Sequence, residues 1–290
     1  MVRSLGLSGP AATVTAGWRE REPDDAELSR LLGGRHVNLR LYQRWLDVQD
    51  RDPEYAAGAR RLDGVLTQLQ DLYLLRLDYA LRAVYALQSR GAGAAGPGAD
   101  AFAEAVAAVR DLDAAHLRRV GELRGEFYQR WRPHDLPPVA GHRAAVAGVL
   151  GEAAAVVIAG GHVGVLADTL HLFNVAPVLR SPVIAWSAGA MALTGRIVLF
   201  NDTAPQGPGH PEVYTAGLSV LRGMVALPHA SGRLLLRDLP RMALLARRFA
   251  PARCVLLDPG TRVDTSSDGP CPAGTRVIAG DGRVTLLDAA

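Results

Sequence analysis

The sequence predicts an α/β protein, a three-layer α/β/α sandwich with a mostly parallel, flavodoxin-like sheet and a long helical insertion. Short apolar runs alternate with helical patterns near the amino terminus and again in the second half of the chain. Between them, apolar residues recur at steps of three and four over two long stretches. We therefore expect residues 1–53 to begin the α/β domain, 54–133 to form the insertion, and 134–290 to complete the domain.

Composition and charge narrow the class of protein. Apolar residues make up 49% of the chain and charged residues 21%, as in soluble globular proteins. The net charge is only +3 and no dense basic block appears, so no nucleic-acid partner is expected. No apolar run is long enough for a membrane helix or a secretory signal, and we expect a cytoplasmic protein without a membrane partner.

Cys254 and Cys271 are too few for a disulfide framework and lack metal-ligand spacing. They could pair across a turn, but in a cytosolic chain they are expected to be reduced packing residues. We expect neither a metal nor a cofactor.

The first segment predicts a strand, a helix and a second strand. An apolar run covers residues 11–15, and Pro23 with the aspartates after it is typical of a helix start. The glycine pair at 33–34 makes a tight turn before a second strand at 36–42.

The insertion predicts two long amphipathic helices joined by a flexible, glycine-rich loop at 91–98. The apolar stripes comprise Leu62, Leu66, Leu69, Tyr73 and Leu77 in the first helix, and Phe102, Val106, Val109, Leu112, His116, Val120, Leu123 and Phe127 in the second. Such an arm suits a lid, a docking surface or a dimerisation surface, and a homodimer through it is one expectation.

The α/β pattern resumes after residue 134. Helices are expected at 141–150, 163–173 and 234–249, strands at 153–159, 183–186, 196–201, 224–227 and 253–258, a proline- and glycine-rich loop at 203–213, and a terminal hairpin.

Residues 182–191, Pro-Val-Ile-Ala-Trp-Ser-Ala-Gly-Ala-Met, have the pattern of a nucleophile elbow around Ser187. In such an elbow a strand turns sharply into a helix, and small neighbours allow the serine hydroxyl to protrude. The usual motif is G-x-S-x-G, and Ala185 replaces its first glycine. The alternative is an ordinary buried serine at a strand end.

A serine nucleophile needs a base and a carboxylate behind that base. His229 follows a predicted strand beyond the elbow, whereas His210 lies in the flexible loop and is the competing candidate. Asp202, at the end of the strand after the elbow, is the candidate carboxylate, with Glu212 as the alternative.

An oxyanion hole needs two preorganised backbone N–H groups. Ala188 offers one, and Gly161, at a strand end opening a helix, offers the second. Gly160 and the neighbouring His162 would then face the substrate, and Arg233 could recognise a substrate carboxylate. The glycine pair alone also fits a plain strand-to-helix turn or an anion site.

The chain resembles the serine peptidase family that contains aspartyl dipeptidase (dipeptidase E) and cyanophycinase, within the class I glutamine amidotransferase-like fold. The supporting segments are 159–162, Ala-Gly-Gly-His; 185–190, Ala-Trp-Ser-Ala-Gly-Ala; 217–223, with His229 and Arg233 beyond it; and 256–263. His162 departs from the asparagine often found there, and the helical region at 54–131 resembles an insertion into the family's core. Because amidotransferases of this fold use cysteine at the elbow, glutaminase activity is not expected.

The resemblance implies a serine hydrolase that cleaves a small peptide or isopeptide through an acyl-enzyme, with Ser187 as nucleophile, His229 as base, Asp202 as third member, and Gly161 with Ala188 as oxyanion hole. The alternative is a non-catalytic ligand-binding or scaffold protein that uses the helical arm for protein contacts.

Overall fold

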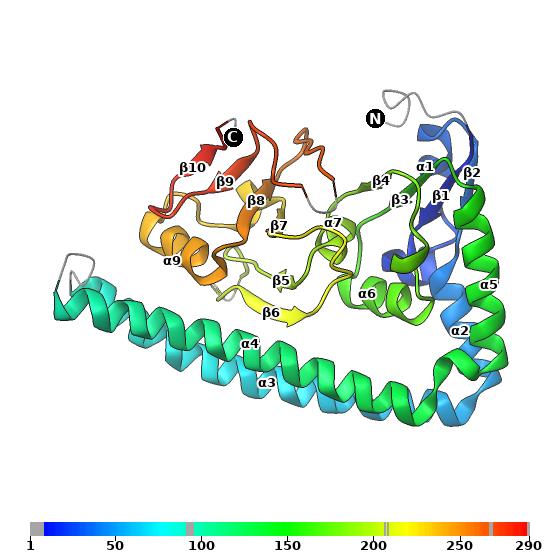
Figure 1. Ribbon diagram of the computed structural model, residues 1–290, viewed down its shortest axis with the longest axis horizontal. Helices are drawn as coiled ribbons and strands as arrows, with labels where there is room; N and C mark the ends of the chain where they lie inside the picture. The colour runs from blue at the N-terminus through cyan, green and yellow to red at the C-terminus, as the bar shows by residue number, and fades with distance from the viewer. Residues whose placement is uncertain (1–8, 91–95, 206, 208, 267–268, 289–290) are drawn as a thin grey trace. The chain divides into compact units, whose positions relative to one another are not determined.

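The computed structural model describes residues 9–90, 96–205, 207, 209–266 and 269–288. The protein is mixed α/β, and Figure 1 shows its elements along the chain. It separates into two compact units: unit 1 is Met1–Arg60 with Phe127–Leu193, and unit 2 is Arg61–Glu126 with Thr194–Ala290. Most of the predicted insertion therefore groups with the C-terminal part of the predicted α/β domain.

Unit 1 is built on a four-stranded parallel sheet in the order β2-β1-β3-β4. The strands are β1 (Ala11–Val14), β2 (His36–Asn38), β3 (Ala155–Ile158) and β4 (Val183–Ala185). All residues of β1 and β3 are buried, as expected for apolar strands of a parallel sheet. The expected second strand stops early because Arg40 adopts a left-handed backbone, with φ of 49°, and the chain enters a helix.

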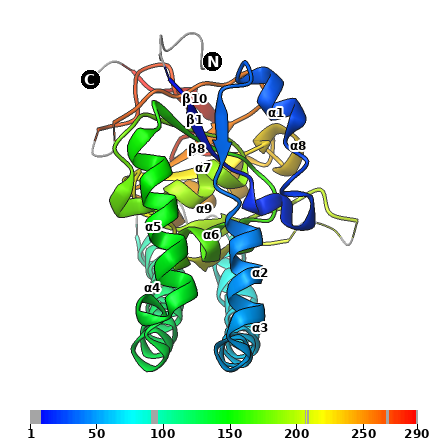
Figure 2. The same ribbon diagram turned by 90° about the vertical axis from the view of Figure 1, so that its right-hand side faces the viewer.

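The helices of unit 1 are α1 (Ala26–Leu31), α2 (Leu41–Arg51), α5 (Pro137–Glu152), α6 (Val163–Leu172) and α7 (Ala188–Leu193), with short 3-10 turns at Ala16–Arg21, Pro133–Asp135 and Ala176–Val178. Figure 2 shows α2 and α5 running alongside one another. His142 of α5 joins them, because its ring lies 2.9 Å from the Arg44 guanidinium and 2.7 Å from the Asp47 carboxylate.

Unit 2 contains a second four-stranded sheet in the order β10-β9-β8-β7. Its strands are β7 (Met224–Pro228), β8 (Arg253–Leu257), β9 (Arg276–Ile278) and β10 (Val284–Leu286). Only the β7–β8 pair is parallel in this sheet. An antiparallel pair, β5 (Ile197–Leu199) with β6 (Glu212–Thr215), and the helices α8 (Ala230–Arg233) and α9 (Leu239–Phe249) complete the strands and helices described in this half of the chain.

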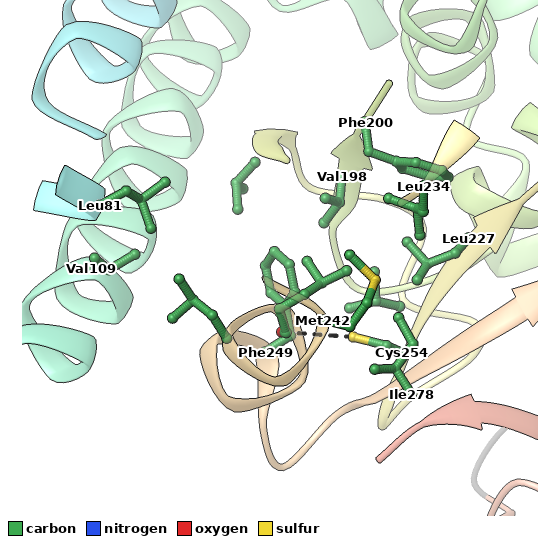
Figure 3. Close-up of a cluster of buried hydrophobic side chains, with 14 of the residues drawn as sticks. Leu81, Val109, Val198, Phe200, Leu227, Leu234, Met242, Phe249, Cys254 and Ile278 are labelled. Atoms are coloured by element: carbon green, nitrogen blue, oxygen red, sulfur yellow. Dashed lines mark hydrogen bonds between the residues drawn. The ribbon is translucent and has the colours of Figure 1, made fainter. Parts of the chain in front are cut away.

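The two long helices that the apolar spacing predicted are α3 (Pro53–Ser89) and α4 (Pro97–Trp131), and they lie side by side (Figure 1). Residues 91–95 of the expected glycine-rich connection lie outside the described residues. In unit 2, one face of the helix pair packs on the strands and α9. Figure 3 shows this core, in which Leu81 and Val109 of the helices share one cluster with Met242, Phe249 and Cys254.

A buried ion pair lies in the same unit. Arg248 of α9 donates two hydrogen bonds of 2.7 Å to the Asp113 carboxylate of α4, and each side chain is only 2% exposed. The Tyr73 hydroxyl of α3 donates to the same carboxylate at 2.8 Å, and Arg248 also donates to the Pro211 carbonyl. This network therefore ties three helices to the segment that precedes β6.

Length alone does not make α3 or α4 a membrane helix. Among the helices of the described residues, none is both long enough and apolar enough to cross a membrane.

Candidate active site

Ser187 stands between β4 and α7 with a left-handed backbone, φ of 52°. Non-glycine residues rarely adopt this conformation, which costs about 1–3 kcal/mol. The turn is closed on both sides: the Gly189 N–H donates to the Trp186 carbonyl at 3.0 Å, and the Met191 N–H donates to the Ser187 carbonyl at 3.1 Å. This is the strand-to-helix geometry that a nucleophile elbow requires.

The residues around Ser187 are small because other parts of the chain lie too close to leave room for a side chain. A Cβ added to Gly160 would lie 2.8 Å from the Ser187 Cβ and 3.1 Å from its Oγ. One added to Gly189 would lie only 2.3 Å from the carbonyl oxygen of Ile158. The parallel pairing of β3 with β4 explains the first contact, since Ile158 pairs with Ala185 and the two chains leave the sheet together. Side chains at either glycine would push the elbow away from β3.

Of the two residues predicted to form an oxyanion hole, Ala188 directly follows Ser187, and Gly161 follows Gly160, which packs against the Ser187 side chain. Ala188 is the first residue of α7, so its N–H has no intrahelical acceptor, and it lies 3.6 Å from the position of a Cβ on Gly160. Gly161 has φ of 115° and packs against the Gly17 carbonyl. Within the described residues, the N–H groups of Gly160, Gly161 and Ala188 donate no hydrogen bond. The donors of Ala188 and Gly160, which lie close to Ser187, are thus free.

His162 has a structural task that the sequence did not predict. It is the N-cap of α6, and its Nδ1 accepts a hydrogen bond of 3.2 Å from the Val165 N–H. In the neutral ring the proton is therefore on Nε2. The residue is exposed, so Nε2–H remains a donor available to a ligand.

His229 belongs to unit 2 and occupies a turn of the same kind as Ser187. It follows β7, precedes α8 and has φ of 56°. Its N–H donates to the Leu257 carbonyl at 3.0 Å, and the residue is exposed. The structure therefore places His229 as an exposed residue at the carboxyl end of a parallel strand.

Asp202 is buried and engaged with other partners. Arg241 donates to both of its carboxylate oxygens, at 2.6 and 3.1 Å, and the Leu235 N–H donates at 3.1 Å. The Asp202 N–H donates to the Arg233 carbonyl at 2.7 Å, whereas Arg233 itself is exposed. The structure therefore brings Asp202 and Arg233 together but gives Asp202 no bond to His229.

Asp258 is a second carboxylate near His229 that the sequence did not predict as a site residue. It directly follows β8, and Pro228 pairs with Leu257, so Asp258 and His229 leave neighbouring parallel strands at the same edge. Asp258 accepts hydrogen bonds from the Ser231 N–H at 2.8 Å and hydroxyl at 2.6 Å. The sequence feature that could have indicated Asp258 is an acidic residue at the end of the predicted strand at 253–258.

The surroundings of Asp258 favour the ionised form of its carboxylate. Partial burial acts to raise its pKa, but the bonds from Ser231 and the Arg276 guanidinium, 2.9 Å away, outweigh burial and lower the pKa below its ordinary value. Asp258 therefore holds the short helix that begins after His229 as an ionised group.

The competing candidates lie in packed surroundings. His210 stacks on Tyr85 with ring centroids 5.9 Å apart, and burial lowers its pKa. Burial also raises the pKa of Glu212, which accepts a hydrogen bond of 2.9 Å from Gln70. Both residues contact side chains of α3 from the segment at 203–213, and this packing explains their burial without a catalytic role.

Neither cysteine is paired, and no group of three or more metal-ligating side chains occurs among the residues that the structure describes. No protein-family profile, curated protein or solved structure matches this chain.

Proposed function

We propose that this chain is a serine hydrolase in which Ser187 attacks the carbonyl of a small peptide or isopeptide. The observation that carries the proposal is the left-handed backbone of Ser187 between β4 and α7, with Gly160 packed against its side chain. Strained backbone of this kind concentrates at functional sites. The resemblance of the elbow segment to serine peptidases of the dipeptidase E and cyanophycinase family supports the same proposal.

The proposed reaction has two halves. The Ser187 Oγ forms a bond to the carbonyl carbon while its proton passes to the base, for which we retain His229. The carbon–nitrogen bond then breaks, and the leaving amine takes the proton from the base. Water, deprotonated by the same base, hydrolyses the acyl-enzyme and restores Ser187. The N–H groups of Ala188 and Gly161 stabilise the oxyanion in both halves.

The orienting carboxylate is assigned to Asp258 rather than to Asp202. Arg241 already occupies both oxygens of Asp202, so moving that carboxylate to His229 would leave the half-buried Arg241 without its carboxylate partner. Asp258 instead fixes Ser231, two residues beyond His229. We assign Asp258 as a positioning residue for the turn that presents the base.

A non-catalytic binding or scaffold role is the second candidate, and one observation favours it. Within the described residues, no carboxylate forms a hydrogen bond with the His229 side chain, because Asp202, Asp258 and Glu212 all have other partners. A chain that had kept the elbow only as a structural turn would look the same at this point.

A peptide panel tests the proposal. Short acidic and basic peptides, with β-linked aspartyl peptides included, are incubated with the wild type, Ser187→Ala and Ser219→Ala. Ser219 is the matched control because it also has a left-handed backbone, φ of 54°, but does not join a strand to a helix. We expect hydrolysis that survives Ser219→Ala and is lost in Ser187→Ala. Hydrolysis unchanged in folded Ser187→Ala would refute the nucleophile.

A further inference from the structure

The outer face of α3 carries a row of exposed apolar side chains. Val65, Leu72, Leu75 and Tyr79, here called the outer stripe, are 45, 60, 56 and 65% exposed. The opposite face of the same helix is buried in the core of unit 2. Large apolar residues gathered along one open face of a helix mark an interaction surface.

The spacing of the outer stripe is that of a coiled-coil seam. Val65, Leu72 and Tyr79 are seven residues apart, as at heptad positions a, and Leu75 occupies the d position between the last two. Gln68 occupies the preceding d position and is also exposed. The seam from Val65 to Tyr79 is about 21 Å long at 1.5 Å per residue.

The stripe is presented on a helix that is already formed. Tyr73, Leu77, Leu81 and Val84 anchor α3 in the core. Binding of a second helix to the stripe therefore carries no free-energy cost for folding α3. Because this cost is absent, even a short seam can associate.

The charges that flank the stripe select its partner. Asp71 is at position g and Arg76 at position e, and neither forms an ion pair within the described residues. In a parallel pair of α3 helices, Asp71 of each copy faces Arg76 of the other. An antiparallel pair would instead place Asp71 beside the other copy's Asp78, which is repulsive. The sequence of α3 is therefore complementary to itself in the parallel orientation.

We propose that the outer stripe binds the same stripe of a second copy, forming a two-fold parallel dimer with α3 against α3. In each layer of this interface, a residue of one chain contacts the same residue of the other chain. The proposal rests on α3 alone and is independent of any chemistry at Ser187.

Sedimentation of the full chain, from low micromolar to submillimolar concentration, tests the surface. We expect the wild type to shift from monomer to dimer and Leu72→Glu/Leu75→Glu to stay monomeric. Thr67→Glu, at an exposed position of the same helix away from the stripe, is the matched control and should dimerise like the wild type. Because all three positions are exposed, thermal unfolding should be unchanged. A wild type that is monomeric throughout, or a dimer that tolerates the double substitution, overturns the proposal.

Charge exchange and cross-linking test the orientation. Asp71→Arg alone should weaken the dimer, and adding Arg76→Asp should restore it. In a Cys271→Ser background, Leu75→Cys should form an intermolecular disulfide on mild oxidation, whereas Thr67→Cys should not. Cross-linking that requires mixing Leu72→Cys with Leu75→Cys would show antiparallel pairing and contradict the proposal.

Discussion

Ser187 and His229, the two residues assigned to the chemistry, share one local conformation. Each follows a parallel strand, precedes a helix and has a positive φ. The sequence predicted the turn at Ser187, because a strand pattern followed by small residues can be recognised locally. At His229 it predicted only the end of a strand, and the short helix α8 that follows was not predicted. It could not predict the partners of Asp202, since Arg241 lies 39 residues further along the chain.

The packing at Gly160 predicts a selective loss of reactivity. In Gly160→Ala the new methyl group would lie 2.8 Å from the Ser187 Cβ, so the serine must shift. We expect roughly a hundredfold slower reaction with an acylating probe, because displacement of about an ångström has that effect. Gly148→Ala is the control: it lies inside α5 with open space around it, and should keep the rate and stabilise the fold by about 0.5–1 kcal/mol. Equal rates for both variants would contradict the assigned packing.

The choice between the two histidines can be settled by rate measurements. His229→Ala should lower the rate of acylation at Ser187 by about a thousandfold or more, as removal of a general base does. His210→Ala should leave that rate close to wild type, because His210 packs on Tyr85. Stopped-flow acylation of both variants gives the comparison, and the reverse ranking would assign the base to His210.

At the scale of elements, short strands were the least predictable. The spans of β1, β3, β7 and β8 were close to expectation because their apolar runs are continuous. The antiparallel strand β6 was missed: it is four residues long and follows a proline- and glycine-rich loop, so its pairing with β5 is visible only in three dimensions.

The buried pair of Asp113 and Arg248 joins α4 to α9. Arg248→Met should lower the free energy of unfolding by about 3–5 kcal/mol, because the Asp113 carboxylate is left buried without its cation. Adding Asp113→Leu should restore much of the loss by removing that charge. Urea denaturation followed by circular dichroism measures both variants. An equal or larger loss in the double variant would show that packing, not charge, dominates at this site.

His116 of α4 predicts a pH dependence of stability. Burial lowers its pKa from the ordinary value of 6.5, and the nearby Tyr214 backbone and Asp113 carboxylate offset this effect only in part. The unfolded chain therefore takes up a proton that the folded chain resists, so the stability present above pH 6.5 is lost as the pH falls below it.

His116→Phe keeps the ring that stacks on Tyr73, with centroids 4.1 Å apart, and removes the titrating group. We expect its thermal midpoint to fall less than that of the wild type between pH 7 and pH 5. The exposed His134→Phe should follow the wild type. If the thermal midpoints of all three proteins fall equally with pH, the acid sensitivity comes from groups other than His116.

At the scale of the whole molecule, the division into two compact units was not predicted. The sequence indicated an α/β domain with an inserted arm. The changes of periodicity at residues 54 and 133 mark where elements begin and end, but they do not show which elements pack together. Likewise, α3 is apolar on two faces: the predicted apolar stripe includes Tyr73, which is buried, but only the fold shows that the second face, with Leu72, is open. The outer stripe is thus a property of tertiary structure.

The central claim is that Ser187 is a reactive nucleophile. Its most direct test is fluorophosphonate labelling of the native full chain, followed by intact-mass measurement and peptide mapping. We predict one adduct per chain, on the peptide that contains Ser187, absent from Ser187→Ala and retained in Ser219→Ala. A native wild type that takes up no probe, or an adduct that persists in folded Ser187→Ala, would contradict the account.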